Sequence, residues 1–448
     1  MKQFEVNMKK FLAFSALLAL AFAALAATKE VVIPFKQFKL KNGLTVILSE
    51  DHSAPTYSIA VSYNVGSRNE KEGRTGFAHL FEHMMFQGSE NVAKTEHSTL
   101  ISTNGGSLNG TTDEDRTLYF ESLPANQLDL GLFLEADRMR SLAVTQANLD
   151  NQRNAVQEER RLRVDNQPYG KTFEAVNGTA YDNFAYRHSV IGSMEDLNAA
   201  SLQDVQDFFK RYYAPNNAVV AIVGDFKSDE VMAKMNKYFG EIPAQPAPPQ
   251  PDMAEPAQTA ERRKTLEDSF AQLPRIDIVY KIPAGDTADF YALRVMSQIL
   301  SAGQSSRMYQ HLVKEQELAQ NAFAGANSQR GPGLEQLGAM VRPGKDIAAV
   351  EKALYAEVAK IQTEPATDEE MEKVHMIARR SQVANAQSSL NRAIELADAT
   401  VNFGNTNMVN ETYQKTIAVT KADVMRVAKK YLTENNRTVI ITLPKKAQ

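Results

Sequence analysis

The chain has 448 residues, of which 43% are hydrophobic and 23% are charged, an ordinary balance for a globular protein with more than one domain. The formal net charge is −4 at pH 7, and no block of Lys and Arg is interleaved with aromatic residues, so nothing indicates nucleic-acid binding. The chain has no cysteine, which excludes disulfide bonds and thiolate ligands. Any metal must therefore be bound by His, Asp or Glu.

The first 26 residues have the pattern of a secretory signal that is removed from the mature protein. Two lysines precede the apolar run 11–23, and the small-residue tripeptide 24–26 is a typical cleavage site. The run is short for a membrane anchor, and no other segment is long and apolar enough to span a bilayer. We therefore expect a cleaved signal at 1–26, translation from Met1 or Met8, and a periplasmic or secreted protein without a membrane span.

In chain order, strand-like runs and helical stretches mix without strict alternation, which favours an α+β fold over a doubly wound parallel sheet. Runs rich in β-branched and aromatic residues predict strands at 44–48, 58–65, 116–122, 218–223 and 276–280. Apolar residues at helical spacing predict helices at 75–87, 145–163, 201–213, 287–301 and 367–403.

The first of these helices carries the residues that point to a metal. Its sequence, TGFAHLFEHMMFQG, has Thr75 as the N-cap, apolar residues along its length, and Gly88 just past its end. His79 and His83 are four residues apart and share one face, so both imidazoles can reach one tetrahedral metal with Glu82 beside them. Two histidines satisfied within a core are the alternative, but a carboxylate at this HxxEH spacing favours a zinc site.

A third metal ligand is expected on the next long helix, because catalytic zinc uses three protein ligands and one open position. The run NLDNQRNAVQEERRLR offers the adjacent carboxylates Glu158 and Glu159. At helical spacing Glu159 shares the least polar face with Val156 and Leu162, whereas Glu158 falls beside Arg161, so Glu159 is the better candidate. A solvated surface position is the alternative. The remaining histidines show no metal spacing and are interpreted as residues at the surface or around a site: His52, His97, His188, His311 and His375.

A proline-rich stretch divides the mature chain into two halves. The sequence IPAQPAPPQPDMAEPAQ at 242–258 predicts an extended linker between an N-terminal zinc-binding domain at 27–241 and a C-terminal domain at 259–448 without the zinc motif. Both halves end in a helix, an Asn-Asn turn and a β-branched strand, so we expect two duplicated domains, each a mainly antiparallel sheet with helices packed on one face. The matching residues, at a constant offset (423 − 204 = 219), are Asp204, Tyr212, Asn216 and Asn217 in the first half and Asp423, Tyr431, Asn435 and Asn436 in the second.

These motifs resemble the family of pitrilysin, insulysin and the mitochondrial processing peptidase, the zinc peptidases with the inverted HxxEH motif. The resemblance covers nearly the whole mature chain, including residues 66–91, 105–124 and 188–197. It implies that Glu159, which follows His83 by 76 residues (159 − 83 = 76), is the third ligand of one Zn²⁺ per chain. It also implies that each half is a helix-backed sheet and that four such units enclose a peptide-sized chamber.

The resemblance gives a role to the segment 107–112. In the family this segment is an edge strand to which an extended substrate adds as a further strand, which implies that Asn109, Gly110 and Thr111 contact the peptide. The alternative is a hairpin turn, because Asn-Gly is a strong turn signal. Both interpretations stay open on the sequence alone.

One departure from the family concerns the second half. Single-chain relatives carry an Arg and a Tyr seven residues apart that steady the substrate and the oxyanion, and the matching positions in the run HLVKEQELAQNA are Val313 and Gln320. Valine has no donor and glutamine is neutral, so neither replaces the Arg and Tyr. We therefore expect a homologous partner subunit that carries the Arg/Tyr pair, forming a heterodimer of the two-chain bacterial type, or else a homodimer.

The expected function is zinc-dependent endopeptidase activity on peptides or unfolded segments, with Glu82 as the general base that deprotonates a zinc-bound water. A non-catalytic peptide-binding or assembly subunit of the same fold is the alternative. The intact zinc motif favours the enzyme over that alternative.

Overall fold

The first of two β-sheets contains the segment 107–112, which is expected to bind peptide. The computed structural model describes residues 31–445, so the expected signal at 1–26 lies outside the described residues. The strands of the first sheet lie in the order β1-β2-β6-β3-β5-β4, and all neighbouring strands are antiparallel except β2 and β6. The strands are β1 (Lys36–Lys39), β2 (Thr45–Glu50), β3 (Thr56–Tyr63), β4 (Ser107–Thr112), β5 (Thr117–Pro124) and β6 (Ala218–Gly224).

One face of this sheet packs on helices of the same half. Because successive side chains of a strand point to opposite faces, Val46, Ile59 and Val220 share a face, and they join one core with Leu132 of α4 and Val231 of α10. The helical elements of this half are η1 (Ser67–Asn69), α2 (Phe77–Met84), α3 (Glu96–Thr103), η2 (Ala125–Gln127), α4 (Leu128–Ser141), α5 (Gln146–Arg160), η3 (Arg161–Asp165), α6 (Gly170–Ala180), α7 (Phe184–Arg187), α8 (Met194–Ala199), α9 (Leu202–Tyr212), η4 (Pro215–Asn217) and α10 (Ser228–Phe239).

The second sheet has the order β7-β11-β8-β10-β9, in which only β7 and β11 are parallel neighbours. The strands are β7 (Arg262–Asp268), β8 (Arg275–Ile282), β9 (Ala319–Ala326), β10 (Gly333–Val341) and β11 (Arg437–Pro444). The helical elements are α11 (Ala288–Ser301), η5 (Tyr309–Glu315), α12 (Ile347–Thr363), α13 (Asp368–Gln387), α14 (Ser389–Phe403), α15 (Met408–Ile417), α16 (Lys421–Tyr431) and η6 (Glu434–Asn436). The helical stretch expected at 367–403 consists of two helices, because Ser388 ends α13 and caps α14 by accepting the N–H of Asn391.

The two halves repeat the same local structure at their ends. Asn217 donates its side-chain amide to the carbonyl of Tyr212 at 2.8 Å, and Asn436 donates to the carbonyl of Tyr431 at the same distance. The preceding helices α9 and α16 both begin with a capping box, in which a hydroxyl and an aspartate satisfy the first free N–H groups. The expected α+β fold of two duplicated, mainly antiparallel domains is confirmed.

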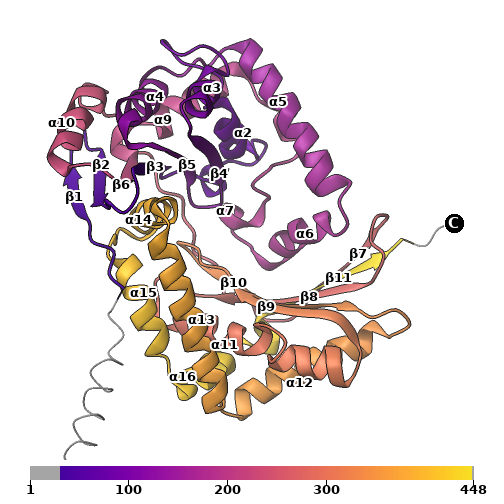
Figure 1. Ribbon diagram of the computed structural model, residues 1–448. Helices are drawn as coiled ribbons and strands as arrows, with labels where there is room; N and C mark the ends of the chain where they lie inside the picture. Colours follow the sequence, from indigo (N-terminus) through magenta and orange to yellow (C-terminus); the bar gives the residue numbers. More distant parts are fainter. Residues whose placement is uncertain (1–30, 446–448) are drawn as a thin grey trace, which may run out of the picture. The chain divides into compact units, whose positions relative to one another are not determined.

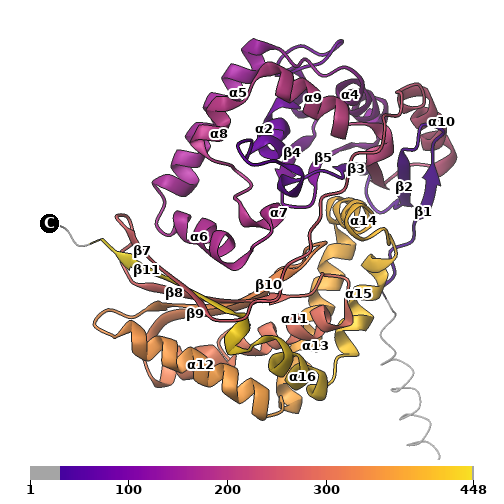
Figure 2. The same ribbon diagram turned by 180° about the vertical axis from the view of Figure 1, so that it is seen from behind.

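The second face of each sheet is covered by a helix from the other half, as the two views in Figure 1 and Figure 2 show. On the first sheet, Leu396 of α14 packs in one buried cluster with Ile47 and Ala60. On the second sheet, Val176 of α6 packs in another with Val279. The sequence pattern predicted helices on one face of each sheet only. It does not reveal that a helix from the other half of the chain packs on the second face.

The expected linker lies between the end of α10 and the start of β7, and this part of the structure contains no helix or strand. It is held by specific contacts: Glu255 accepts from the backbone N–H of Asn183 at 2.8 Å and from Lys281 at 2.7 Å. The boundaries at 241 and 259 stay predictions. Among residues 31–445, no helix is both long and apolar enough to cross a bilayer.

Candidate metal and peptide site

Helix α2 begins at Phe77, two residues into the predicted motif, and its N-terminus is held by a buried carboxylate. Gly76 occupies the N-cap in the left-handed region, with φ 85°, where a side chain would also press on the carbonyl of Ile191. The expected cap, Thr75, is wrong, because its hydroxyl donates to Asp196 at 2.5 Å. Instead Glu70 accepts the N–H groups of Gly76 at 2.9 Å and Ala78 at 2.8 Å. An anion at this end of a helix is stabilised by the helix dipole.

His188 supports that carboxylate. Its Nε2 lies 2.9 Å from Glu70, whose side chain is fully buried. Burial alone would lower the pKa of His188, but the contact with Glu70 outweighs it, and the pKa is raised. His188 therefore acts on α2 from a distance, as one of the histidines expected around a site. His52, by contrast, is exposed at the surface, as expected.

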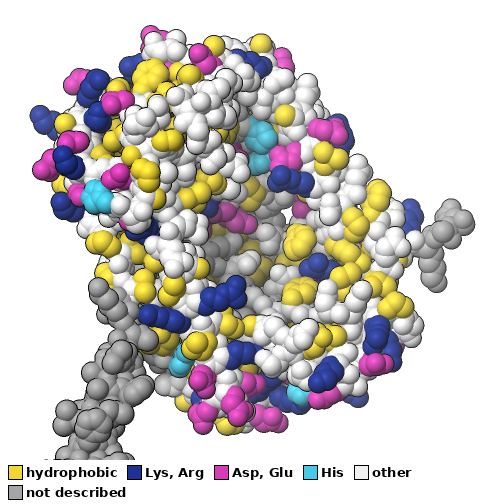
Figure 3. Space-filling view, in the orientation of Figure 1, with side chains coloured by type: hydrophobic (Ala, Val, Ile, Leu, Met, Phe, Trp, Pro, Cys, Tyr) yellow, Lys and Arg dark blue, Asp and Glu magenta, His cyan; other side chains and the backbone are white. Residues whose placement is uncertain are grey.

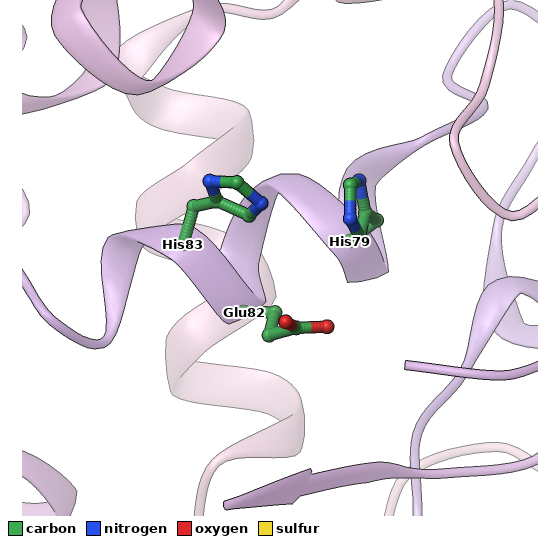
Figure 4. A group of neighbouring side chains, drawn as sticks. All are labelled: His79, Glu82 and His83. Carbon is green, nitrogen blue, oxygen red and sulfur yellow. The ribbon is translucent and has the colours of Figure 1, made fainter. Parts of the chain in front are cut away.

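The three motif residues lie together on α2. The imidazole rings of His79 and His83 are 4.8 Å apart at 71°, and both project from the same helix as Glu82 (Figure 4). One ligand atom from each of the three residues lies within 4.8 Å of the others. The spacing in the sequence therefore produces a compact group of possible metal ligands.

Glu159 meets this group from the last turn of α5. Its Oε2 lies 3.6 Å from Nε2 of His79 and 3.2 Å from Nε2 of His83. Only 17% of its side chain is exposed, so the alternative interpretation of Glu159 as a solvated surface residue is wrong. The other oxygen, Oε1, accepts from Arg163 at 2.8 Å, a contact that the sequence pattern did not indicate.

The donor atoms of His79, His83 and Glu159 fit a zinc ion. Zinc bonds of about 2.0–2.2 Å in a tetrahedron place ligand atoms about 3.3–3.6 Å apart, close to the two separations between Oε2 of Glu159 and the imidazole nitrogens. Burial lowers the pKa of His79 to about 4, so its imidazole is neutral and can ligate at pH 7. The hydrogen bond from His83 holds the pKa of Glu159 below its usual range, so that this carboxylate is ionised.

Glu82 points from α2 toward the strand β4. Its Oε2 accepts from the hydroxyl of Thr112 at 2.6 Å. Gly110 lies so close that an added Cβ would be 3.1 Å from Cγ of Glu82 and 3.3 Å from the ring of Tyr119. Burial raises the pKa of Glu82, against the opposing effect of the Thr112 hydrogen bond. The carboxylate is thus packed against the strand rather than free in solvent.

The segment 107–112 is a strand and not a turn. Asn109 pairs with Phe120 and Gly110 with Tyr119 across β4 and β5, and the chain reverses later, where Asp113 accepts the N–H of Arg116. Since β4 is the last strand of its sheet, its other edge has no neighbouring strand among the described residues. The side chain of Asn109 is exposed and accepts from the N–H of Gly110. The hairpin alternative for Asn-Gly is therefore wrong.

A cavity of about 350 Å³ opens beside the candidate ligands. Its wall includes His79, Glu159, Arg163 and Thr112, together with the exposed ring of Phe173. Figure 3 shows a hollow on this face where histidine, acidic and basic side chains lie together. The group of candidate ligands is therefore accessible to a molecule from solution.

A second cluster, around His97, was missed in the sequence. Its Nε2 lies 3.6 Å from Glu121, and Glu135, which pairs with Arg138, completes a fully buried group. Two carboxylates and one guanidinium give −2 + 1 = −1, which one proton neutralises, whereas a divalent ion would leave a buried net charge of +1. Burial raises the pKa of Glu121 to about 7 and lowers that of His97 to about 3. We interpret this group as a buried cluster of titratable side chains in the core, so the surface interpretation of His97 is wrong.

The positions expected to lack the Arg/Tyr pair lie in the second half. Val313 is on η5 and packs against the second core, and Gln320 is on the strand β9 with its side chain exposed. The strand β9 is the edge of its sheet, as β4 is of the first. Neither position brings a cationic or phenolic donor to this edge.

Comparison with known proteins identifies the family. Residues 45–193 match the family model described as insulinase (peptidase family M16), and residues 199–377 match the model described as the peptidase M16 inactive domain. The zinc protease PqqE of Helicobacter pylori is 30% identical over 448 residues, which cover 99% of this chain and all of that protein. The chain belongs to peptidase family M16. The resemblance to pitrilysin and its relatives is thereby confirmed.

Other relatives and solved structures are similar to this M16 chain over most of its length. The probable mitochondrial-processing peptidase subunit beta of Arabidopsis thaliana is 22% identical over 89% of this chain and 76% of that protein. A protease structure from Helicobacter pylori superposes with a TM-score of 0.89 at 30% identity, covering 92% of this chain and all of the other. The first half of the periplasmic protease PqqL from Escherichia coli shares the fold, with a TM-score of 0.76 at 20% identity over 94% of each chain.

Proposed function

We propose that this M16 chain is a zinc-dependent endopeptidase that hydrolyses peptides or unfolded segments. The observation that carries the proposal is that Oε2 of Glu159 lies 3.6 Å from Nε2 of His79 and 3.2 Å from Nε2 of His83. Glu82 lies beside these residues, and β4 is the edge strand of its sheet among the described residues. Relatives named zinc proteases, such as the Helicobacter pylori protein, support it.

In this proposal His79, His83 and Glu159 hold one Zn²⁺ per chain. Bound zinc supplies a Lewis acid that makes water nucleophilic near neutral pH and polarises a carbonyl. Two imidazoles and one carboxylate are a ligand set that catalytic zinc uses, and they leave one position open. The remaining oxygen of Glu159 is held by Arg163, which orients the carboxylate.

Glu82 is the general base. Its carboxylate accepts a proton from the water that attacks the peptide carbonyl and then delivers a proton to the leaving amine. The carboxylate is suited to this role because it lies beside the candidate ligands and is held by Thr112 on its far side.

The substrate is an extended peptide that adds to β4 as a further strand. Asn109, Gly110 and Thr111 lie in the middle of this strand and would contact the peptide. Main-chain hydrogen bonds at a free edge make few demands on side-chain sequence, so segments that are already unfolded are favoured. A folded domain cannot present its backbone in this way.

The decisive experiment combines metal analysis with cleavage of a quenched unfolded-peptide library. Glu82→Gln should keep one zinc per chain and lose at least about 100-fold in kcat. The exposed Glu90→Gln, a control of the same charge change, should cleave like the unmodified chain. If Glu82→Gln cleaves at the full rate, the assignment of the base fails, and if the chain binds no zinc, the assignment as a metalloenzyme fails.

We further propose a heterodimer with a homologous subunit that carries the missing Arg and Tyr. The support is that Val313 and Gln320 provide no such donors, and the loss of one oxyanion donor costs on the order of 100-fold in rate. Mixing the chain with that subunit should raise kcat/KM by a similar factor. Equal cleavage by the chain alone would instead favour a homodimer with a different donor.

The signal-like sequence at 1–26 supports a periplasmic or secreted location, which fractionation of an expressing cell would test. The alternative of a non-catalytic peptide-binding subunit makes a different prediction in the cleavage experiment. Such a subunit would bind unfolded peptides without cleaving them, whether or not zinc and a partner are present.

A further inference from the structure

The carboxylate of Glu82 is connected to the second half of the chain through a short series of hydrogen bonds. The first of these is the 2.6 Å bond from the hydroxyl of Thr112 to Oε2 of Glu82. Thr112 is the last residue of β4, and it pairs with Thr117 directly before the turn that leads into β5. A hydroxyl that donates to a carboxylate fixes its direction as well as its distance. The position of Glu82 thus depends on where the end of β4 lies.

Arg116 fixes the end of β4. Its guanidinium donates to the carbonyl oxygen of Thr111 at 3.1 Å and to the hydroxyl of the same residue at 2.9 Å. The remaining N–H groups donate to both oxygens of Asp398, at 3.1 and 3.3 Å. A guanidinium that forms a two-point contact with a carboxylate has little freedom to rotate, so Arg116 joins the strand and Asp398 with a defined geometry.

Asp398 belongs to α14, which comes from the second half of the sequence. Its carboxylate also accepts from the hydroxyl of Ser62 on β3 at 3.3 Å. The helix is anchored by Leu396 and Ala397, which are buried in the cluster that covers the first sheet. The carboxylate is therefore held on a rigid support, and this support is encoded far from the candidate site.

We propose that Asp398, Arg116 and Thr112 are positioning residues, through which the second half of the chain holds the peptide-binding end of β4 and the carboxylate of Glu82 in their working geometry. The inference rests on the proposed function of Glu82 as general base. None of the three residues is assigned a proton transfer. Their role is to hold the carboxylate of Glu82 and the edge of β4 in a fixed relative position, since a displacement of about 1 Å can cost on the order of 100-fold in rate.

The first test removes only the hydroxyl of Thr112. Thr112→Val keeps the shape of the side chain and should lower kcat about tenfold or more, with zinc content and KM unchanged. Thr112→Ser retains the hydroxyl and should restore most of the rate. The control Thr99→Val changes an exposed hydroxyl on α3 and should have no effect. A full rate in Thr112→Val, or an equal loss in the valine and serine variants, would overturn the role of Thr112.

The second test breaks the contact between the halves. Asp398→Asn should lower kcat and should speed amide hydrogen exchange in residues 107–112, while exchange in α2 and zinc content stay unchanged. The control Glu351→Gln disrupts an exposed two-point contact with Arg263, at 2.6 and 2.9 Å, and should change neither property. Unchanged exchange in β4 of Asp398→Asn would overturn the tether.

These tests separate the inference from the proposed function. If the unmodified chain binds no zinc or Glu82→Gln cleaves normally, the proposed function fails, and the kinetic part of the inference fails with it. The hydrogen-exchange comparison does not depend on catalysis. Faster exchange confined to β4 in Asp398→Asn would then still establish that Asp398 holds the strand. Normal cleavage and unchanged exchange in Asp398→Asn would refute the inference and leave the proposed function intact.

Discussion

The Nε2 atom of His83 and the Oε2 atom of Glu159 lie 3.2 Å apart, although 76 residues separate them (159 − 83 = 76). The contact is possible because α2 and α5 pack against each other in the first core, where Leu149 and Val156 bury one face of α5. That packing directs Glu159 toward the two imidazoles. The candidate metal site therefore depends on the relative position of two helices as much as on the motif itself.

Glu159→Gln should weaken zinc binding by about 100-fold or more, because it replaces the one anionic ligand with a neutral amide. Competition with a fluorescent zinc chelator measures this change directly. Glu158→Gln is the matched control, since its side chain is 59% exposed and pairs with Arg161. Equal zinc affinities for the two variants would contradict the choice of Glu159 over its neighbour.

Gly110→Ala should lower kcat/KM by about tenfold or more, because the new methyl group would press on Glu82 at 3.1 Å and on Tyr119. Zinc content should stay at one per chain. The control is Gly325→Ala on β9, an edge strand where an added Cβ meets no atom within 4 Å. Similar kinetics for the two variants would show that the close approach at Gly110 is not required.

Glu70→Gln should lower the free energy of unfolding by about 2 kcal/mol, because a buried acceptor of two backbone N–H groups and His188 loses its charge. It should also weaken zinc binding, since the N-terminus of α2 loses its anchor. Denaturant titration and metal analysis measure the two effects. Glu72→Gln provides the comparison, because that side chain is 75% exposed, and a loss of stability as large as in Glu70→Gln would exclude the proposed capping role.

Glu335→Gln should stabilise the protein increasingly as the pH rises from 5 to 8. Burial raises the pKa of Glu335 to about 8, so the folded chain keeps a proton that the unfolded chain releases near the ordinary glutamate pKa of 4.5. The contribution of Glu335 to stability is therefore fully present below pH 4.5 and is lost as the pH rises through 8.

The difference in stability between Glu335→Gln and the unmodified chain should grow by about 1.4 kcal/mol per pH unit in this window. Denaturation curves at several pH values measure it, with the exposed Glu369→Gln as control. A difference that does not change with pH would mean that the folded chain does not retain the proton on Glu335.

Features that repeat along one helix could be predicted from the sequence. His79, Glu82 and His83 share a face because of the helical period, and the structure places them together. Glu159 needed two arguments, the least polar face of its helix and the resemblance to a family. The first argument uses only neighbouring residues, and the second uses motifs that can each be read locally in the sequence.

Contacts between distant segments could not be predicted. Glu70 acts on α2 through two hydrogen bonds and Thr112 through one, and neither residue is marked by a repeat or by its neighbours. The Asn109-Gly110 pair is a good turn signal by local preference, yet its pairing with β5 holds it in a strand. Long-range pairing overrides local preference when a whole strand gains hydrogen bonds by it.

Each half of the chain contributes one helix that packs on the sheet of the other half, and this limits how the protein can be divided. Cleavage of the chain within 242–258 would leave α14 seated on the first sheet and α6 on the second, so the fragments should stay associated as a nicked protein. A gene fragment that encodes only the first half would leave Ile47 and Ala60 facing water, and such an apolar surface promotes aggregation. The half that carries the HxxEH motif is therefore not a self-sufficient folding unit, and truncation is a poor route to a smaller protein.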